Sequence, residues 1–219
     1  MVGNTAPVGV LAFQGDFQKH IELLTAMGRR AVAVREPADV DDLGALVIPG
    51  GESTTIGMLM DRFGLMEPVR TRVRDGMPVL GTCAGAILLA REIEGSAQPR
   101  IGVLDVTVRR NAYGRQVESF EADLELAEPV GEPGRADRAD RADRADRTDR
   151  PGAHRSLRAV FIRAPIITRV GAGVEVLARF EDDPVVVRQG SVTAATFHPE
   201  LSGETVVHRL FLENGAVRG

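Results

Sequence analysis

The first ninety residues alternate between short apolar runs and longer segments whose apolar positions recur every three or four residues. Apolar runs lie at 8–13, 31–34 and 43–48, and a shorter one lies at 79–80. Uninterrupted apolar runs are typical of strands that are buried on both faces. We therefore expect four strands joined by helices, in βαβ units that build a parallel, doubly wound sheet.

The segments between these runs carry helical spacing. In the segment from Asp16 to Met27, Phe17, Ile21 and Leu24 share one face, and Gly28 follows as a stop signal. Helices are also expected at 53–63, 65–74 and 84–92.

After Gly95 the pattern becomes rich in β segments separated by turn signals. Strands are expected at 101–109, 116–126, 159–162, 174–180, 184–188 and 192–197, followed by a closing helix at 203–217. The predicted fold class is α/β, with a doubly wound, mostly parallel sheet flanked by helices and a β-rich C-terminal half. We expect residues 1–219 to form a single domain.

Residues 134–152 interrupt this pattern with a low-complexity insertion. Arg135 is followed by four Ala-Asp-Arg triplets and one Thr-Asp-Arg triplet. With no apolar residue larger than alanine, the segment cannot join a core, so we expect a disordered loop without a catalytic role. The alternative is a short exposed helix, in which pairs such as Asp137 and Arg141 would add only ~0.2–0.5 kcal/mol each.

Composition narrows the class of protein. Apolar residues make up 43% of the chain, which is ordinary for a globular protein, and the net charge of −4 argues against a nucleic-acid partner. Neither a signal peptide nor an apolar run of the ~18–20 residues that span a bilayer is evident, so no membrane association is expected. The single cysteine fits a reducing compartment, and we expect a cytoplasmic protein.

That cysteine, Cys83, lies between the apolar run Val79-Leu80 and the predicted helix that begins at Ala84. A strand, a sharp turn and a helix together present a nucleophile. The partial positive charge of the helix N-terminus favours a thiolate, and its free N–H groups can stabilise an oxyanion.

A base for this thiol is expected at His198, which directly follows an apolar strand pattern. In extended backbone His198 and Glu200 would face the same side, with Pro199 stiffening the link. Glu200 could then accept the imidazole N–H, as the orienting group of a triad does. The alternative is a solvated His–Glu pair at a strand end.

The other histidines receive no catalytic assignment. His20 is interpreted as a surface or helix-capping residue, His154 as a loop residue and His208 as an exposed residue of the last helix.

A Gly50-Gly51 turn follows the third predicted strand. Glycine lets the backbone turn its N–H toward a ligand, so Gly51 is a candidate second oxyanion donor beside Ala84. The alternative is a plain turn between strand and helix, because a Gly-Gly turn is a weak signal. The sequence has no nucleotide-binding fingerprint and no zinc-ligand spacing, and we expect no bound metal.

Together these residues resemble the class I glutamine amidotransferases, which have a Gly-x-Cys-x-Gly turn and a later His-x-Glu. The resemblance is closer to one branch, the glutaminase subunits of pyridoxal 5′-phosphate synthase. The segments that carry it are 13–16, 49–55, 81–85, 110–116, 161–165 and 197–200. The resemblance extends over nearly the whole chain apart from the insertion, and it implies a flavodoxin-like fold.

The resemblance implies a mechanism and a set of site residues. Cys83 would attack the side-chain amide of L-glutamine, with His198 and Glu200 completing the triad and the N–H groups of Gly51 and Ala84 forming the oxyanion hole. Glutamine would be held by Gly51, Glu52, Ser53, Arg110, Ile162 and Arg163.

The resemblance also implies a partner. Ammonia would pass to a separate synthase subunit, and the elements around Gln14 and the Gly50-Gly51 turn would face that subunit. The chain itself would bind no cofactor: pyridoxal phosphate chemistry would belong to the partner, and the only lysine, Lys19, lies in a predicted helix near the N-terminus. Two alternatives stay open, another cysteine-dependent amide or ester hydrolase of related fold and a non-catalytic docking subunit.

Overall fold

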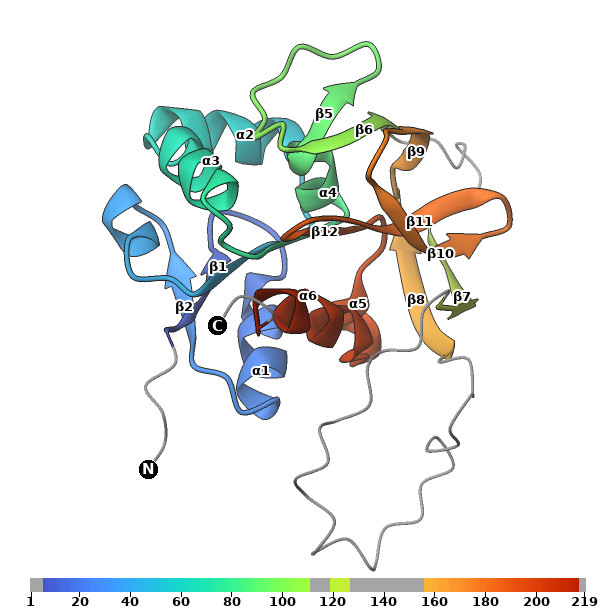
Figure 1. Ribbon diagram of the computed structural model, residues 1–219, viewed down its shortest axis with the longest axis horizontal. Coiled ribbons are helices and arrows are strands. Elements are labelled where there is room, and N and C mark those ends of the chain that lie inside the picture. Colours follow the sequence, from blue (N-terminus) through green and yellow to red (C-terminus); the bar gives the residue numbers. More distant parts are fainter. Residues whose placement is uncertain (1–5, 111–118, 127–155, 217–219) are drawn as a thin grey trace, which may run out of the picture.

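A computed structural model describes residues 6–110, 119–126 and 156–216, without the side chains of 214–216. The insertion at 134–152 and His154 lie outside the described residues. The central sheet consists of β1 (Val8–Leu11), β2 (Ala31–Val34), β3 (Ala45–Ile48), β4 (Val79–Thr82), β10 (Glu175–Phe180), β11 (Asp183–Gln189) and β12 (Val192–Ala195). Its strand order is β10-β11-β12-β4-β3-β1-β2 (Figure 1).

The pairing within this sheet confirms the predicted mostly parallel arrangement. Strands β12, β4, β3, β1 and β2 are parallel to one another, whereas β11 and β10 add an antiparallel edge. The helices are α1 (Phe17–Ala26), α2 (Ser53–Arg62), α3 (Met66–Arg74), α4 (Ala84–Leu89), α5 (Pro199–Ser202) and α6 (Val206–Ala216), with a 3₁₀ helix η1 (Pro37–Val40) after β2.

Helices cover both faces of the sheet, and alternate strand residues point to the two cores (Figure 1). Val47 packs in one core with Leu24 of α1 and Phe211 of α6. Its neighbour Ile48 packs in the other core with Met60 of α2. Burial on both faces explains why these strands read as continuous apolar runs.

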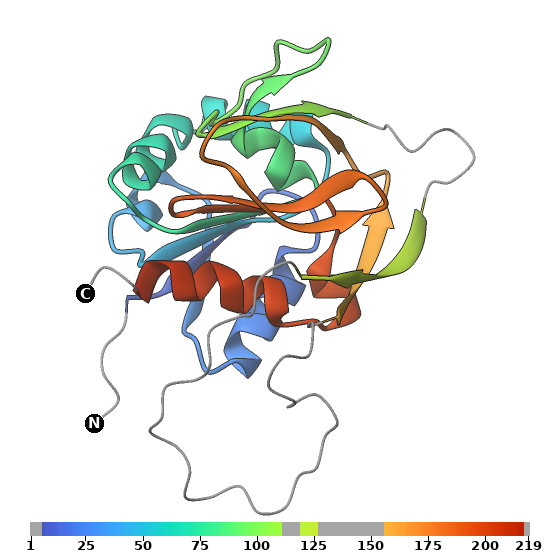
Figure 2. The ribbon, with the colours of Figure 1, turned by 45° about the vertical axis from the view of Figure 1, so that its right-hand side comes forward.

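The β-rich part of the chain adds two small sheets. One contains β5 (Ala90–Ile93), β6 (Leu104–Arg109) and β9 (Ile166–Val170), and the other contains β7 (Ser119–Glu125) and β8 (Ser156–Ile162). Figure 2 shows β7 and β8 beside the β10 edge of the central sheet, where Leu126 forms a bridge with Ala178.

Several element bounds differ from the sequence-based expectation, and some elements were not predicted. The helix expected at 84–92 ends at Leu89, because the following residues pair with β6, with Ile93 opposite Val108. The strand β9 was not predicted. It pairs antiparallel with β6 and buries Ile167, but Thr168 and Arg169 interrupt its apolar pattern.

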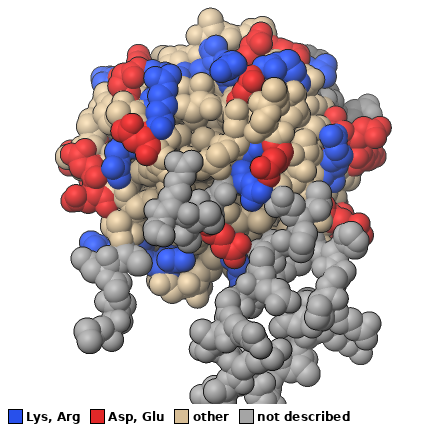
Figure 3. All heavy atoms as spheres, viewed as in Figure 1, with Lys and Arg blue, Asp and Glu red and all other residues tan. Residues whose placement is uncertain are grey.

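The described surface carries both signs of charge. On the face in Figure 3, basic and acidic side chains are interspersed. Of the helices in the described ranges, none combines the length and the apolar character needed to cross a membrane.

Candidate active site

Three neighbouring strands end at one edge of the sheet, and each is followed by a predicted site segment. Strand β3 leads into Gly50 and Gly51, β4 leads into Cys83, and β12 leads toward His198. Because β4 lies between β3 and β12 and all three are parallel, the segments meet at their common carboxyl edge.

Cys83 lies in a strained turn between β4 and α4. Its backbone has φ 48° and ψ −103°, in the positive-φ region that costs a non-glycine residue about 1–3 kcal/mol. The turn is held by a 2.9 Å hydrogen bond from the Cys83 N–H to the carbonyl of Ala195. The side chain is buried, and its Sγ lies 3.8 Å from the carbonyl oxygen of Ile162.

Gly81 and Gly85 let this turn form. A Cβ on Gly85 would lie 1.9 Å from the carbonyl oxygen of Ile48, and a Cβ on Gly81 would lie 2.6 Å from the backbone of Gly85. The close contact of α4 with the sheet therefore requires glycine at both positions. It places Ala84 at the first position of the helix, where an N–H has no intrahelical acceptor.

His198 and Glu200 form the pair that the sequence predicted, but for a different structural reason. The imidazole Nδ1 lies 2.7 Å from Oε1 of Glu200. The two residues do not lie in extended backbone: His198 is the N-cap of α5, Pro199 is its first residue, and Glu200 lies within its only turn.

The pair is electrostatically coupled to Cys83. Burial alone would lower the pKa of His198, but hydrogen bonds to Cys83 and Glu200 and the negative charge of both raise that pKa to about 10. Burial likewise would raise the pKa of Glu200, but hydrogen bonds and positive charge from His198 and His20 hold it well below its usual range. His198 is therefore protonated, and Glu200 ionised, at neutral pH.

The interpretation of His20 and His208 as surface residues is wrong, because both are fully buried. Nε2 of His20 lies 3.2 Å from Oε2 of Glu200, and Nδ1 of His20 lies 2.9 Å from Nε2 of His208. The sequence contained a signal: His20 lies three residues after Phe17 and four before Leu24, on the apolar stripe of α1.

The Gly50-Gly51 turn is supported by the loop that follows β1. A hydrogen bond of 3.1 Å joins the Glu52 N–H to Oε1 of Gln14. Gly15 packs so closely that a Cβ there would lie 1.9 Å from the carbonyl oxygen of Gly50. Gly51 has φ 147°, a conformation that other residues adopt only with strain.

Glu52 and Ser53 begin helix α2. The Glu52 carboxylate accepts hydrogen bonds from the N–H groups of Thr54 and Thr55, at 3.2 and 2.7 Å, and so caps the helix. Burial would raise the pKa of Glu52, but the bonds to Thr55 and Thr54 lower it. Ser53 is buried, and its hydroxyl donates to Oε1 of Gln98 at 3.4 Å.

Gln98 is a residue that the sequence analysis missed. Besides Ser53, its Oε1 accepts hydrogen bonds from Nη1 of Arg110, at 2.8 Å, and from Oγ1 of Thr54, at 3.2 Å. Arg110 also donates to Oγ1 of Thr54 at 2.8 Å. The predicted glutamine-holding residues Glu52, Ser53 and Arg110 thus form one group at the N-terminus of α2.

The end of β8 covers the cysteine. Phe161 is buried, Ile162 directs its carbonyl toward Cys83, and Arg163 follows with an exposed side chain and φ 44°. The structure therefore brings the carbonyl of Ile162 to the nucleophile, and Arg163 is the next residue along the chain.

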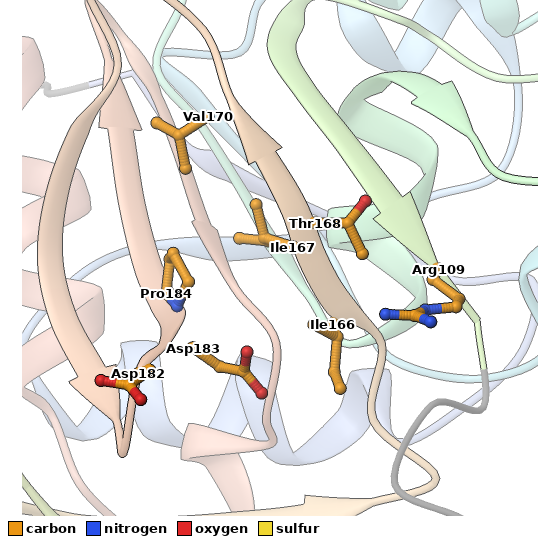
Figure 4. Close-up of a pocket in the computed structure, with 8 residues that line it drawn as sticks. All are labelled: Arg109, Ile166, Ile167, Thr168, Val170, Asp182, Asp183 and Pro184. Atoms are coloured by element: carbon orange, nitrogen blue, oxygen red, sulfur yellow. The ribbon is translucent and has the colours of Figure 1, made fainter.

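A cavity of about 350 Å³ lies elsewhere, between β6, β9 and β11. Figure 4 shows Arg109, Ile167 and Asp183 among its lining residues, and no predicted site residue takes part. Within the described part of the chain, no three His, Cys, Asp or Glu residues form a group that could hold a metal ion.

Comparisons with known proteins show which family the chain resembles. The profile of the SNO glutamine amidotransferase family matches residues 10–217. A protein of Pelotomaculum thermopropionicum named pyridoxal 5′-phosphate synthase subunit PdxT is 53% identical over 206 residues, which cover 94% of this chain and 93% of the relative. A protein of the same name from Thermus thermophilus is 52% identical over 212 residues, which cover 96% and 98%.

Solved structures also match the chain. A crystal structure described as a glutamine amidotransferase matches with a TM-score of 0.81 and 49% identity, covering 95% of this chain and 98% of the other. The PurLQS structure from Thermotoga maritima, at 14% identity and a TM-score of 0.66, shares the fold; the match covers 97% of this chain and 99% of the other. From the family profile and these relatives, the chain belongs to the SNO glutamine amidotransferase family.

Proposed function

We propose that this chain is the glutaminase subunit of a pyridoxal 5′-phosphate synthase, with Cys83, His198 and Glu200 as its catalytic triad. It hydrolyses L-glutamine to glutamate and ammonia. One observation carries the proposal: a buried cysteine in a strained turn lies at the same strand edge as a histidine whose Nδ1 is 2.7 Å from a carboxylate, and this cysteine raises the pKa of that histidine. The names of the relatives that are about half identical to the chain support the substrate and the pathway.

In the first half-reaction the Cys83 thiolate attacks the side-chain amide carbon of glutamine, and the carbonyl oxygen becomes an oxyanion. The imidazolium of His198 gives its proton to the amide nitrogen. The C–N bond then breaks, ammonia leaves, and a glutamyl thioester remains on Cys83. Because the pKa of His198 is raised to about 10, the proton needed by the leaving group is present at neutral pH.

In the second half-reaction neutral His198 removes a proton from water as the water oxygen attacks the thioester carbon. The C–S bond breaks, glutamate is released, and the thiolate and imidazolium are restored. Glu200 holds the ring through Nδ1, so that Nε2 faces the reacting atoms throughout.

The N–H groups of Gly51 and Ala84 stabilise the oxyanion in both half-reactions. Ala84 supplies an unpaired N–H of the first helical turn, and Gly51 lies on the neighbouring strand end. Removing one such donor typically costs about 10²–10³ in rate.

The remaining glutamine contacts in the proposal come from the residues at the N-terminus of α2, with Arg110, and from the end of β8. The Arg110 guanidinium suits the α-carboxylate of glutamine, because its fork can bind both oxygens. Gly51, Glu52 and Ser53 line one side, and Ile162 and Arg163 the other. Glu52 acts here mainly through its cap, which fixes the start of α2.

The proposed partner is a synthase subunit that receives the ammonia and forms pyridoxal phosphate, so this chain needs no cofactor of its own. Its docking surface includes the loop around Gln14, whose side chain bonds to the turn that carries Gly51. Beside this loop, Phe13 stacks on Phe63 with ring centroids 5.5 Å apart. Phe63 and Met58 are large apolar side chains that are exposed.

A docked partner would press on the Phe13–Asp16 loop and so adjust the turn that supplies an oxyanion donor. We expect glutamine hydrolysis to be weak in the isolated chain and faster in the complex. The proposal also includes a cytoplasmic location for the protein, which the single cysteine led us to expect.

Ammonia release from glutamine, measured with and without the synthase subunit, tests the proposal. Wild-type protein should release ammonia, faster with the partner, and Cys83→Ala should release none in either condition. Ammonia release by Cys83→Ala would overturn the assignment of the nucleophile. Turnover of other amides or esters with glutamine ignored would favour a different hydrolase, and no turnover of any substrate would favour a docking subunit.

A further inference from the structure

Two buried histidines from opposite ends of the chain meet behind the catalytic triad. His20 comes from α1 and His208 from α6, 188 positions apart, and their facing ring nitrogens lie 2.9 Å apart. Both side chains are fully buried. Burying an imidazole costs free energy unless its polar atoms have partners, so packing alone does not explain why two histidines are buried here.

The explanation lies at Glu200. One carboxylate oxygen, Oε1, is 2.7 Å from Nδ1 of His198, and the other, Oε2, is 3.2 Å from Nε2 of His20. The side chain of Glu200 is 1% exposed, so protein groups rather than bulk water must stabilise its charge. Oε2 accepts no hydrogen bond from the described residues, so the close approach of the His20 imidazole is what compensates its charge there.

We infer that His20 and His208 are positioning residues of the active site: His20 holds the second oxygen of Glu200, and His208 fixes the ring of His20. This inference rests on the proposed function of the triad. The chain of contacts runs from Cys83 through His198, Glu200 and His20 to His208.

The hydrogen positions follow from the partners. Nε2 of His20 approaches Oε2 of Glu200 to 3.2 Å, an ion-pair distance, although Oε2 accepts no hydrogen bond among the described residues. Burial, together with the neighbouring His20, lowers the pKa of His208 to about 3, so His208 is neutral at physiological pH. A neutral His208 can donate one hydrogen to Nδ1 of His20 or accept one from it, and in either case it fixes the plane of the His20 ring.

The titratable groups around the carboxylate come from several elements. His198 faces it from its own segment and His20 from α1, while Cys83 faces His198 from the β4–α4 turn and His208 faces His20 from α6. The hydroxyl of Thr82, at the end of β4, also lies 3.4 Å from Nε2 of His20. The two histidines thus tie helices α1 and α6 to the strand that presents the nucleophile.

A pair of polar substitutions separates positioning from packing. His20→Gln places an amide N–H near the position of Nε2, toward Glu200, whereas His20→Asn places it near Nδ1, toward His208. In the complex with the synthase subunit, we expect His20→Asn to lower kcat by about 10- to 100-fold, because the buried carboxylate oxygen loses its closest polar contact. KM for glutamine should stay within about 2-fold, and His20→Gln should recover most of kcat.

His208→Leu should have a smaller effect, because it removes only the outer contact. We expect kcat to fall by about 2- to 10-fold, the range of an ordinary hydrogen bond. The matched control is Leu24→Val, one turn along the buried face of α1 and within the apolar core. It should lower the thermal midpoint and leave kcat unchanged.

Equal kcat values for His20→Asn and His20→Gln would overturn the inference, as would a loss in Leu24→Val as large as in His20→Asn. A second readout does not need glutamine turnover. Cys83 is the only cysteine, so alkylation by iodoacetamide below neutral pH reports its thiolate alone. His20→Asn should be alkylated more slowly than wild type, and His20→Gln at nearly the wild-type rate.

The two readouts distinguish failure of the inference from failure of the proposed function. If wild-type protein releases no ammonia from glutamine but the alkylation rates follow the predicted order, the proposed function is wrong and the positioning role stands. If wild type hydrolyses glutamine but both readouts are the same in the Asn and Gln variants, the positioning role is wrong and the proposed function stands.

Discussion

The imidazole ring of His198 fills the space in which a side chain at Gly50 would lie. A Cβ on Gly50 would come within 2.2 Å of Cε1 of that ring. Gly50 has no positive φ, so its backbone alone does not demand glycine. The turn that precedes the candidate oxyanion donor Gly51 therefore also sets the position of the general base.

Gly50→Ala is expected to displace His198 and lower kcat by roughly 10²-fold, the scale on which a misplacement of about 1 Å reduces catalysis. Ammonia release with the synthase subunit present measures it. Gly28→Ala is the matched control: it is strained at φ 76° but meets no atom within 4 Å, so it should reduce stability and spare kcat. Wild-type kcat in Gly50→Ala would contradict the expected clash.

The sequence predicted the parallel strands and the cysteine turn because both depend on local patterns. Strands buried on both faces give continuous apolar runs, and the crossing of α4 over β3 requires the glycine at Gly85 that stands in the motif. The pairing of His198 with Glu200 was also predicted, although a short helix rather than a strand produces it.

The network behind Glu200 could not be predicted in the same way. His20 and His208 lie on helices at opposite ends of the chain, and only the packing of α1 and α6 on one face of the sheet brings them together. Histidine is a polar residue, and a single helix shows no buried partner for it, so His20 was interpreted as a surface or helix-capping residue and His208 as an exposed one. Gln98 was missed for the same reason, because its partners lie on α2 and after β6.

Gln98 is expected to control glutamine binding rather than the chemical step. Gln98→Leu removes the acceptor that Nη1 of Arg110 contacts at 2.8 Å, so the guanidinium loses one of its two anchors. We expect KM for glutamine to rise by about 10-fold, with kcat changed by less than about 2-fold. Steady-state ammonia release in the complex gives both constants.

The control for this change is Gln189→Leu. Gln189 also accepts a hydrogen bond through its side-chain oxygen, from the N–H of Asp105 at 2.8 Å, but it is not part of the proposed site. The Gln189→Leu variant should leave KM for glutamine unchanged. An equal KM in wild type and Gln98→Leu would remove Arg110 from the proposed glutamine site or show that Gln98 does not position it.

Phe63 is expected to matter only in the complex. Phe63→Asp replaces an exposed apolar side chain that stacks on Phe13 with a charge. We expect basal ammonia release to stay unchanged and the stimulation by the synthase subunit to fall by at least about 10-fold, through weaker docking. Titration of the partner measures both quantities.

Thr25→Asp adds the same charge to an exposed position of α1, on the other face of the sheet, and should leave the stimulation intact. Full stimulation of Phe63→Asp would place the docking surface elsewhere.

The low-complexity insertion is expected to be dispensable. Deletion of residues 135–150 removes the Asp-Arg repeats, which contain no apolar residue large enough for a core and none of the family motifs. Ammonia release in the complex and the thermal midpoint should both match the full chain. A loss of either in the deletion variant would show that this segment has a structural or docking role.

The raised pKa of His198 predicts how stability depends on pH. The folded protein keeps this proton up to about pH 10, whereas the ordinary value of the group is 6.5. The contribution of His198 is therefore complete below pH 6.5 and is lost as the pH rises toward 10. Glu200 has the opposite sign: its pKa is lowered, so its contribution is present above its ordinary value of 4.5 and is lost as the pH falls.

Between pH 6.5 and 8, the free energy of unfolding should fall with rising pH by up to about 1.4 kcal/mol per pH unit from His198 alone. Urea titrations at several pH values in this window measure the slope. His198→Gln has no titrating ring at this position, so its slope should be flatter than that of wild type. Identical slopes in the two proteins would mean that folding takes up no net proton at this position between pH 6.5 and 8.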